Sequence, residues 1–321
     1  MKNGSAAGTA LSAVVCNLSF QNPIVLAAGT AGYGEEISRV MNLGALGGFV
    51  TKAVSLAPRV GNKAPRVAEF EGGMINAVGL ANPGLEAVRR EHLPWLANHY
   101  PAARKIVNVV GFTVEEYPAV VEGLEEGLSN GLASAVDAFE INVSCPNTKA
   151  GGMEFGADPK SLEDVVARSR KATKRPMLVK LSPTLPNIAE AAKVSADAGA
   201  DAISVVNTIP GLVIDVEKRR PVLGYGSGGV SGPAILPVGV LATWKVRQAT
   251  SLPIMGVGGV TSGVDAIQYV MAGASLVGVG TAALRDPRAP ERIIGELDSW
   301  CRTHNVRNVL DLKGQLEWPS A

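Results

Sequence analysis

Residues 254–281 read IMGVGGVTSGVDAIQYVMAGASLVGVGT, and this stretch predicts the fold. An apolar run at 254–257 ends in glycines, an amphipathic run follows at 264–271, and a second apolar run occupies 275–279. Short apolar runs bounded by glycine predict buried strands, and the longer amphipathic run predicts a helix. The stretch is therefore a strand-helix-strand unit of the kind that builds a parallel sheet.

The same alternation runs along the rest of the chain. Apolar runs also occur at 24–28, 48–51, 105–110, 138–142, 177–181 and 202–206. Amphipathic runs lie between them at 35–43, 85–98, 114–127, 162–173, 187–198 and 236–249. Eight strands with intervening helices are expected to close into a (β/α)8 TIM barrel, because an open sheet usually has fewer strands. No linker divides the sequence, so we expect residues 1–321 to form a single barrel domain.

Several segments are expected to elaborate the barrel. A hairpin of 13–15 and 18–20 would turn at Cys16-Asn17 and plug the N-terminal end of the barrel, and residues 1–10 would form a flexible tail. Segments 59–82 and 208–233 are too long for simple turns and rich in Gly and Pro, which predicts active-site inserts over the C-terminal face. A Gly-Ala pair at 44–45, 199–200 and 273–274 follows a helical run each time, where a left-handed glycine would end the helix.

The composition excludes several classes of protein. The 321 residues are 46% hydrophobic and 18% charged, with a net charge of +1, so nucleic acid is not an expected partner. Three cysteines and three histidines are too few and too scattered for a disulfide framework or a metal site. No apolar run approaches the ~20 residues of a transmembrane helix, and the start lacks the features of a signal peptide. We therefore expect a cytoplasmic protein that makes no contact with a membrane.

Polar side chains collect where the predicted strands end. Lys52 follows the second strand, Asn108 lies in the third, Asn142 ends the fourth, Lys180 ends the fifth and Asn207 follows the sixth. In a (β/α)8 barrel the C-terminal ends of the strands carry the active site. Any one of these residues could be an ordinary hydrogen-bonded strand end. A lysine is rarely buried without a partner such as an anionic ligand, however, and two are present here.

Glycine-rich turns follow the last two predicted strands. They are Gly256-Val257-Gly258-Gly259 and Gly278-Val279-Gly280-Thr281. The loops after strands seven and eight of this fold commonly bind phosphate, because glycine lets backbone N–H groups approach the oxygens. The alternative is that these glycines only shape tight turns. The pair of turns in neighbouring units predicts a ligand that carries phosphate.

The densest polar segment is INVSCPN at 141–147, where an apolar strand runs directly into Ser144, Cys145 and Asn147. Cys145 could be a buried packing thiol, but its place after a barrel strand favours a catalytic role. A thiol can act as a base near neutral pH if its surroundings favour the thiolate. No histidine follows a predicted strand, since His92, His99 and His304 fall in helical stretches expected to be exposed. A Cys-His nucleophile pair is thus disfavoured, which leaves Cys145 as a proton acceptor.

Six motifs resemble those of the class 1 dihydroorotate dehydrogenases. They are TKAVSL at 51–56, NAVGLANPG at 76–84, INVSCPN at 141–147, VNTIPG at 206–211, GGVSGPAI at 228–235 and MGVGGVTSG at 255–263. The resemblance extends over residues 24–284 with the motifs in the same order. It implies an FMN-dependent (β/α)8 enzyme of pyrimidine biosynthesis that oxidises (S)-dihydroorotate to orotate.

The resemblance also implies roles for single residues. Cys145 would be the general base that removes the C5 proton while the C6 hydride passes to flavin N5. Lys52 would be the second catalytic residue and would lie near both flavin and substrate. The residues that would hold the substrate are Lys52, Asn76, Ala77, Val78, Gly79, Leu80, Asn142, Asn147, Asn207 and Thr208. Those that would hold FMN are Ala28, Lys52, Ala53, Asn108, Asn142, Lys180, Val206, Gly232, Gly258, Gly259, Gly280 and Thr281. Lys180 would sit at the N1/C2=O edge of the flavin, and Ala28, where related enzymes often have serine, can offer only backbone contact.

The stretch INVSCPNTKAGGMEFG at 141–156 is similar to subfamily 1B, whose catalytic chain works with an FAD and [2Fe-2S] subunit and NAD+. This implies a homodimer of catalytic chains that binds two electron-transfer subunits, a heterotetramer. The chain itself has no GxGxxG after a strand, and three dispersed cysteines cannot ligate an iron-sulfur cluster. FAD and [2Fe-2S] are therefore expected only in the partner. The C-terminal LDLKGQLEWPSA at 310–321 matches no motif that we can interpret.

Three rival readings stay open at this point. One is an FMN-dependent dihydropyrimidine dehydrogenase acting on dihydrouracil-type substrates, against which Asn147 and the Asn76 loop argue. Another is a fumarate-using class 1A enzyme. The third is a non-flavin barrel that binds a phosphate sugar, and a colourless purified protein would favour it.

Overall fold

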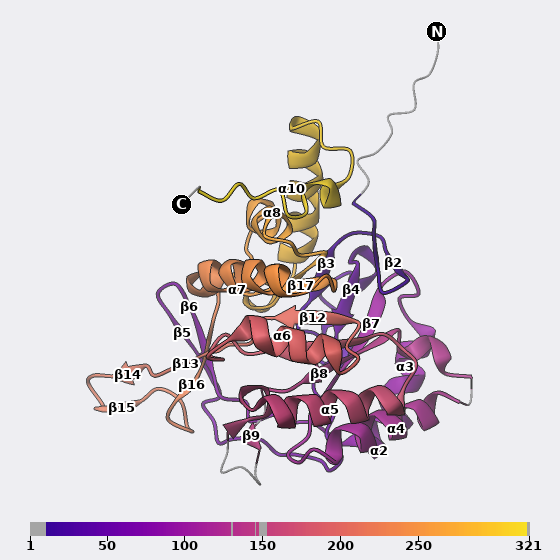
Figure 1. The fold of residues 1–321 in the computed structure, drawn as a ribbon. Coiled ribbons are helices and arrows are strands. Elements are labelled where there is room, and N and C mark those ends of the chain that lie inside the picture. The colour runs from indigo at the N-terminus through magenta and orange to yellow at the C-terminus, as the bar shows by residue number, and fades with distance from the viewer. Residues whose placement is uncertain (1–10, 130, 145, 148–152, 320–321) are drawn as a thin grey trace.

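The computed structural model describes residues 11–129, 131–144, 146–147 and 153–319. Eight parallel strands close into a barrel, which confirms the predicted (β/α)8 fold (Figure 1). In order around the barrel they are β3 Ile24–Leu26, β4 Gly48–Val50, β7 Arg104–Val109, β8 Ala138–Asn142, β11 Met177–Leu181, β12 Ala202–Val205, β17 Ile254–Val257 and β18 Leu276–Val279. Every predicted strand is present. The first is shorter than expected and leaves Ala28 beyond its end.

Helices follow the strands and cover the outside of the barrel (Figure 1). The α-helices are α1 Glu35–Ser38, α2 Leu85–Ala87, α3 Leu93–Asn98, α4 Glu116–Leu128, α5 Pro159–Ala172, α6 Ile188–Asp197, α7 Leu236–Ala249, α8 Gly263–Met271, α9 Thr281–Arg285 and α10 Ala289–Thr303. A π-helical stretch, Val88–His92, joins α2 to α3. Short 3-10 helices are η1 Leu43–Ala45, η3 Ala133–Ala135, η5 Phe155–Ala157, η6 Pro233–Ile235 and η7 Val309–Leu312. None of the helices described could cross a lipid bilayer, since none is both long and apolar enough.

Two helical expectations need correction. The helix expected over 35–43 ends at Ser38, and the Asn42 side chain then accepts a hydrogen bond from the backbone N–H of Gly44, which begins a 3-10 turn. Gly44 consequently does not take the left-handed conformation expected of it. The other two glycines of the repeated Gly-Ala pair do, since φ is 105° at Gly199 and 119° at Gly273. Glycine adopts this conformation without steric cost, so both helices end there.

An N-terminal hairpin closes one end of the barrel, as predicted. Its strands are β1 Ala13–Val15 and β2 Leu18–Phe20, and its turn residues Cys16 and Asn17 both have positive φ. The Cys16 thiol donates a hydrogen bond to the carbonyl of Asp201, directly before β12. Apolar side chains of the hairpin pack with interior side chains from all eight barrel strands. The cluster contains Ala13, Val15, Phe20, Val25, Ala27, Val50, Ile106, Ala138, Leu178, Ala202, Met255, Val257 and Leu276.

The two long inserts pair with each other in one antiparallel sheet. Residues 59–82 form β5 Val67–Phe70 and β6 Gly73–Asn76, while residues 208–233 form β13 Ile209–Gly211 and β16 Gly228–Ser231. The sheet order is β13-β16-β6-β5, and a small hairpin of β14 Ile214–Asp215 and β15 Arg220–Pro221 projects from it (Figure 1). Both inserts follow the C-terminal ends of barrel strands, β4 and β12, so the sheet belongs to that face of the barrel.

Candidate active site

The predicted ring of polar residues lies at the C-terminal ends of neighbouring strands. Strand pairing places Asn108 of β7 opposite Glu140 of β8, and Lys180 of β11 opposite both Asn142 of β8 and Ser204 of β12. Asn108, Glu140, Lys180 and Ser204 each lie two residues after a member of the interior apolar cluster. Because side chains alternate along a strand, they share the interior face of the barrel.

Glu140 links Asn108 and Lys180 within this interior layer. It was not among the residues expected from the sequence. The Asn108 Nδ2 atom donates a 2.6 Å hydrogen bond to Glu140 Oε1, and Lys180 Nζ lies 3.7 Å from the same oxygen. All three side chains are buried, with exposures of 1% for Asn108, 0% for Glu140 and 6% for Lys180. The signal was present in the sequence AFEIN at 138–142, where a charged residue interrupts an apolar strand two positions before Asn142.

Two buried oxygen atoms of this layer have no hydrogen-bond partner in the part of the chain that the structure describes. They are Glu140 Oε2 and Ser204 Oγ. Buried polar groups in proteins nearly always have a partner, which is protein, ordered water or ligand. The unpaired oxygens, together with the buried Lys180, show that the barrel interior near the C-terminal ends of the strands is polar, unlike the apolar core below it.

Lys52 lies two residues after the end of β4 and is half-buried. Its backbone N–H donates to the carbonyl of Gly32, but its side chain has no ion-pair partner among the described residues. The neighbouring Thr51 hydroxyl accepts a 3.3 Å hydrogen bond from the backbone N–H of Asn108, which ties this segment to β7. The next residue, Ala53, is buried. Lys52 therefore offers, at this face of the barrel, a positive charge that no described residue neutralises.

A tyrosine beyond β3 supports this segment and changes one expectation. The Tyr33 hydroxyl donates to the carbonyl of Ala53 at 3.1 Å, and its ring stacks on His92 with the centroids 4.2 Å apart. His92 is consequently half-buried, not exposed as the sequence analysis expected. His99 and His304 are exposed, as predicted. Burial raises the pKa of Tyr33 far above its ordinary value, so its hydroxyl stays protonated as a donor.

The first insert carries the predicted substrate loop back to the barrel. Asn76 ends β6, and its Nδ2 atom donates a 3.3 Å hydrogen bond to the carbonyl of Gly229 in β16. Gly79 and Leu80 both have positive φ, 74° and 57°. This turn directs Leu80 against Ala53 and Val110 at the barrel face. Ala77 and Val78, which lie between Asn76 and Gly79, form backbone hydrogen bonds with Arg66 and Asn62 of the same insert.

The second insert begins after β12 and comes close to the loop that follows Asn76. The backbone N–H of Asn207 donates to the carbonyl of Leu181, and the Asn207 side chain accepts from the N–H of Thr208 at 2.8 Å. Thr208 lies against Gly229, where a Cβ would come within 2.0 Å of its hydroxyl. Asn76 and Thr208 thus meet at the same glycine. Val206, just before, donates its backbone N–H to the carbonyl of Val257.

The predicted phosphate-binding glycines also come together. Gly258 and Gly259 follow β17 with φ of 128° and 75°, and Gly232 follows β16 with φ of 98°. A Cβ on Gly232 would lie 3.5 Å from Thr281 Cγ2, and a Cβ on Gly259 would lie 2.5 Å from the backbone nitrogen of Leu236. A Cβ on Gly280 would lie 3.7 Å from Ala27, the residue before Ala28. The turns after β17 and β18 therefore lie close to the end of β16 in the insert sheet and to the segment that follows β3.

Of the predicted site residues, Cys145 lies outside the described residues, and for Asn147 only the backbone is described. Asn147 lies in a two-residue strand, β9 Pro146–Asn147, which pairs with β10 Met153–Glu154. Before Cys145 in the sequence, the side-chain oxygen of Asn142 accepts a 3.3 Å hydrogen bond from the backbone N–H of Ser144. The backbone carbonyl of Asn142 accepts a hydrogen bond from the Tyr117 hydroxyl. Asn142 lies two residues after Glu140 in β8 and therefore shares its interior face.

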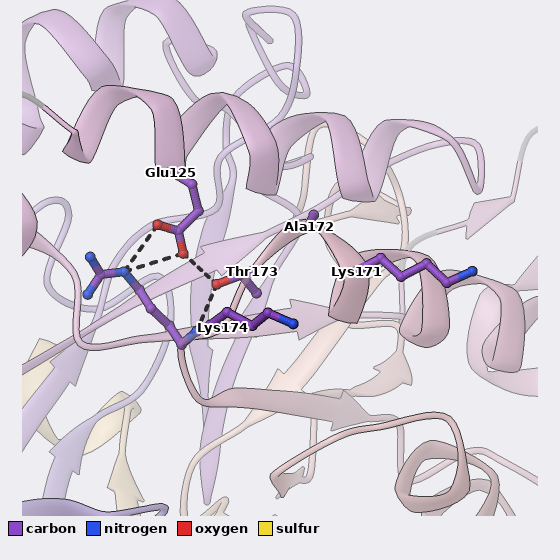
Figure 2. Close-up of a pocket in the computed structure, with 6 residues that line it drawn as sticks. Glu125, Lys171, Ala172, Thr173 and Lys174 are labelled. Carbon is purple, nitrogen blue, oxygen red and sulfur yellow. Dashed lines mark hydrogen bonds and ion pairs between the residues drawn. The ribbon is translucent and has the colours of Figure 1, made fainter.

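Two surface hollows lie away from these residues. One is at the N-terminal side of β11, where the Thr173 hydroxyl donates to Glu125 and Arg175 Nε lies 3.4 Å from the same carboxylate (Figure 2). The other lies along α10, beside Trp300 and His304. Neither hollow shares a residue with the strand ends described above. Among the described residues no group of three His, Cys, Asp or Glu side chains could hold a metal ion.

Comparison with known proteins gives a consistent result. A family model described as "Dihydroorotate dehydrogenase" matches residues 10–300. The chain is 44% identical over 307 residues to a protein of Geobacter sp. (strain M21), covering 96% of this chain and 98% of the relative. It is 45% identical over 303 residues to one of Pelobacter propionicus, covering 94% and 97%. Both relatives are named "Dihydroorotate dehydrogenase B (NAD(+)), catalytic subunit". With this match over most of its length, and a closed barrel of the expected kind, the chain belongs to the dihydroorotate dehydrogenase family.

Proposed function

We propose that this chain is the catalytic subunit of an NAD+-linked dihydroorotate dehydrogenase. It oxidises (S)-dihydroorotate to orotate in pyrimidine biosynthesis, and the electrons reach NAD+ through a partner subunit. The family match and the similarity to NAD+-linked catalytic subunits over nearly the whole chain support this assignment. The structural observation that carries it is the buried polar layer of Asn108, Glu140 and Lys180, at the same barrel end as the glycine turns after β17 and β18.

The residues of the site fit a flavin, the cofactor that membership of this family implies, and we assign it as FMN. The left-handed glycines and the Thr281 hydroxyl suit a phosphate, while the unpaired Ser204 hydroxyl and the two lysines suit a polar ring with anionic character. FMN, when bound, would supply the acceptor for the hydride that leaves C6 of the substrate. We assign its binding to Ala28, Lys52, Ala53, Asn108, Asn142, Lys180, Val206, Gly232, Gly258, Gly259, Gly280 and Thr281.

The chain's own part in the reaction is to bind the substrate and accept a proton. We assign Cys145 as the general base that takes the proton from C5, so that loss of this proton and of the C6 hydride leaves a C5–C6 double bond. Lys52 balances the substrate carboxylate, and this role is supported by the fact that none of the residues that the structure describes is its counterion. The other substrate-binding residues are Asn76, Ala77, Val78, Gly79, Leu80, Asn142, Asn147, Asn207 and Thr208. Amide side chains suit a pyrimidinedione, because they both donate and accept hydrogen bonds.

Lys180 has a different task from Lys52. We assign it to the edge of the flavin where negative charge develops on reduction, because it is the buried cation of the interior layer. A fixed positive charge in a water-poor site stabilises a developing negative charge more strongly than the same charge in water. Lys180 therefore favours reduction of the flavin, whereas Lys52 favours binding of the substrate.

The assembly and location of the protein belong to the same proposal. The words "catalytic subunit" in the names of the relatives support a partner subunit, which we assign as the carrier of FAD and [2Fe-2S] in a heterotetramer built on a dimer of catalytic chains. We further propose a cytoplasmic enzyme. We treat the chain as one barrel domain, because each insert leaves the barrel and returns to it.

An acceptor experiment tests the assignment. The isolated chain is purified, its cofactor is released and identified, and dihydroorotate or dihydrouracil is then supplied with NAD+, fumarate or an artificial dye. We expect FMN, and dye reduction with dihydroorotate alone. Turnover of dihydrouracil in place of dihydroorotate would identify a dihydropyrimidine dehydrogenase. Rapid NADH formation by the isolated chain would contradict the partner subunit, and efficient fumarate reduction would indicate the class 1A type. A colourless protein would favour a non-flavin barrel.

A further inference from the structure

We propose that Glu140 is a positioning residue that fixes Lys180 and Asn108 and, through its negative charge, lowers the reduction potential of the flavin. This inference rests on the proposed flavin site. It assigns to Glu140 a task opposite in sign to that of Lys180. The two side chains together would then set how readily the bound cofactor accepts the hydride.

The contacts of Glu140 support a positioning role. The residue lies in the middle of β8, and its two partners come from the strands on either side, β7 and β11. Both partners contact the same carboxylate oxygen, Oε1, at 2.6 Å for Asn108 Nδ2 and 3.7 Å for Lys180 Nζ. One buried carboxylate therefore holds a side chain of each neighbouring strand.

The carboxylate also determines which end of Asn108 is available to a ligand. A carboxylate only accepts hydrogen bonds, so the NH2 group of Asn108 must face it. The carbonyl oxygen of the Asn108 amide is then presented as an acceptor. Lys180 would otherwise be a long side chain with several rotamers, and its contact with Glu140 restricts them.

Stability of the barrel does not account for a carboxylate at this position. Burying a charged pair costs desolvation energy, and apolar side chains of similar volume are often as stable or more stable at such sites. The β8 residue Ala138 two positions earlier, on the same face, belongs to the apolar interior cluster. The second carboxylate oxygen of Glu140 has no hydrogen bond within the described chain, so the group is not fully satisfied by the fold itself.

The electrostatic consequence follows from the positions of the charges. Reduction adds negative charge to a flavin, and a buried carboxylate near it opposes that change because the surroundings screen charge weakly. Lys180 acts in the other direction. Removing the charge of Glu140 should therefore make the flavin easier to reduce, and removing the charge of Lys180 should make it harder to reduce.

The test compares Glu140→Gln, Lys180→Met and the double variant with the wild type as flavin-loaded chains. Midpoint potentials are measured by equilibration with a reference dye. For Glu140→Gln we expect at least a tenfold rise in the ratio of reduced to oxidised flavin at a fixed ambient potential, about 30 mV for a two-electron couple. Lys180→Met should shift the ratio the other way. The double variant should lie between them. Because it removes both members of the buried pair and leaves neither charge of that pair alone, it serves if Glu140→Gln does not fold.

A matched control separates this effect from a general loss of a carboxylate. Glu125 is also partly buried and ion-paired, with Arg175 at 3.4 Å (Figure 2). It lies near the C-terminal end of α4, and Arg175 precedes β11, so the pair belongs to the N-terminal end of the barrel. Glu125→Gln should alter the unfolding temperature. It should change the ratio of reduced to oxidised flavin at the same ambient potential by less than twofold. An unchanged or lowered potential in flavin-loaded Glu140→Gln would overturn this inference alone. A chain that takes up no flavin would overturn the proposed function and this inference with it.

Discussion

The Thr281 hydroxyl, at the start of α9, donates a 2.8 Å hydrogen bond to the Ser231 hydroxyl at the end of β16. This bond joins the last barrel strand to the sheet formed by the two inserts. Thr281 is buried, whereas Ser231 is only partly so. The glycine turn proposed to hold phosphate is therefore fixed to the segment proposed to cover the site, and a change at one should be felt at the other.

Replacing Thr281 by valine should weaken cofactor binding. The substitution keeps the shape of the side chain but removes a hydrogen bond, whose net contribution is typically about 0.5–1.5 kcal/mol, so the flavin dissociation constant should rise about 2- to 12-fold. Fluorescence titration of the flavin-free chain measures it. Thr243→Val is the control, because the Thr243 hydroxyl donates within α7 to the carbonyl of Gly239. Equal affinities for both variants and the wild type would remove Thr281 from the phosphate site.

Gly259 should not tolerate even a methyl group. Its φ is 75°, and a Cβ would lie 2.5 Å from the backbone nitrogen of Leu236, where α7 begins. Gly259→Ala should therefore displace the turn and reduce flavin affinity. In contrast, Gly295→Ala meets no atom within 4 Å in the middle of α10 and should be neutral or stabilise the helix by up to about 1 kcal/mol. Flavin titration and thermal unfolding of both variants check this, and normal flavin binding by Gly259→Ala would contradict it.

Cys145→Ala should slow flavin reduction by dihydroorotate about 10²- to 10⁴-fold, the usual contribution of a general base. Cys145→Ser should keep some activity, with its pH profile moved to higher pH, because a hydroxyl is a much weaker acid than a thiol. Stopped-flow measurement of flavin bleaching over a range of pH gives both results. Reduction of Cys145→Ala at the wild-type rate would show that another group takes the proton.

The two described thiols should be poorly reactive near neutral pH. Burial, and then the nearby Asp201, raise the pKa of Cys16 to about 11, and burial followed by Asp298 also raises that of Cys301. Little thiolate is then present at about pH 8, so iodoacetamide should label both slowly. For Cys16 the folded chain keeps a proton that the unfolded chain releases, so its contribution to the free energy of unfolding should fall as pH rises toward 11. Mass spectrometry that found rapid labelling of Cys16 in the folded chain would contradict this assignment.

The barrel strands could be predicted because each is an apolar run bounded by glycine or a polar end, and burial on both faces demands that pattern. Helix α10 was not among the expected helices, although its sequence carries the signal. Ala289, Ile293, Leu297 and Cys301 are buried and spaced four residues apart, which marks one face of a helix. The pairing of β6 with β16 could not be predicted, since register between segments more than 150 residues apart depends on tertiary contacts and not on local sequence.

The candidate site was only partly visible in the sequence for a similar reason. Lys52, Asn108 and Lys180 could be placed at strand ends by counting from the apolar runs. That Lys180 shares an oxygen of Glu140 with Asn108 depends on the order of three neighbouring strands and on their register. A charged residue inside a strand is a signal worth following, because a carboxylate is rarely buried without a partner.

The visible spectrum of the purified protein, recorded before and after addition of dihydroorotate, shows whether this chain uses a flavin to oxidise that substrate. We expect a yellow protein whose flavin absorption bleaches when dihydroorotate is added without oxygen, and does not bleach with dihydrouracil. A protein without flavin absorption, or a flavin that stays oxidised in the presence of dihydroorotate, would show that the proposed function is wrong.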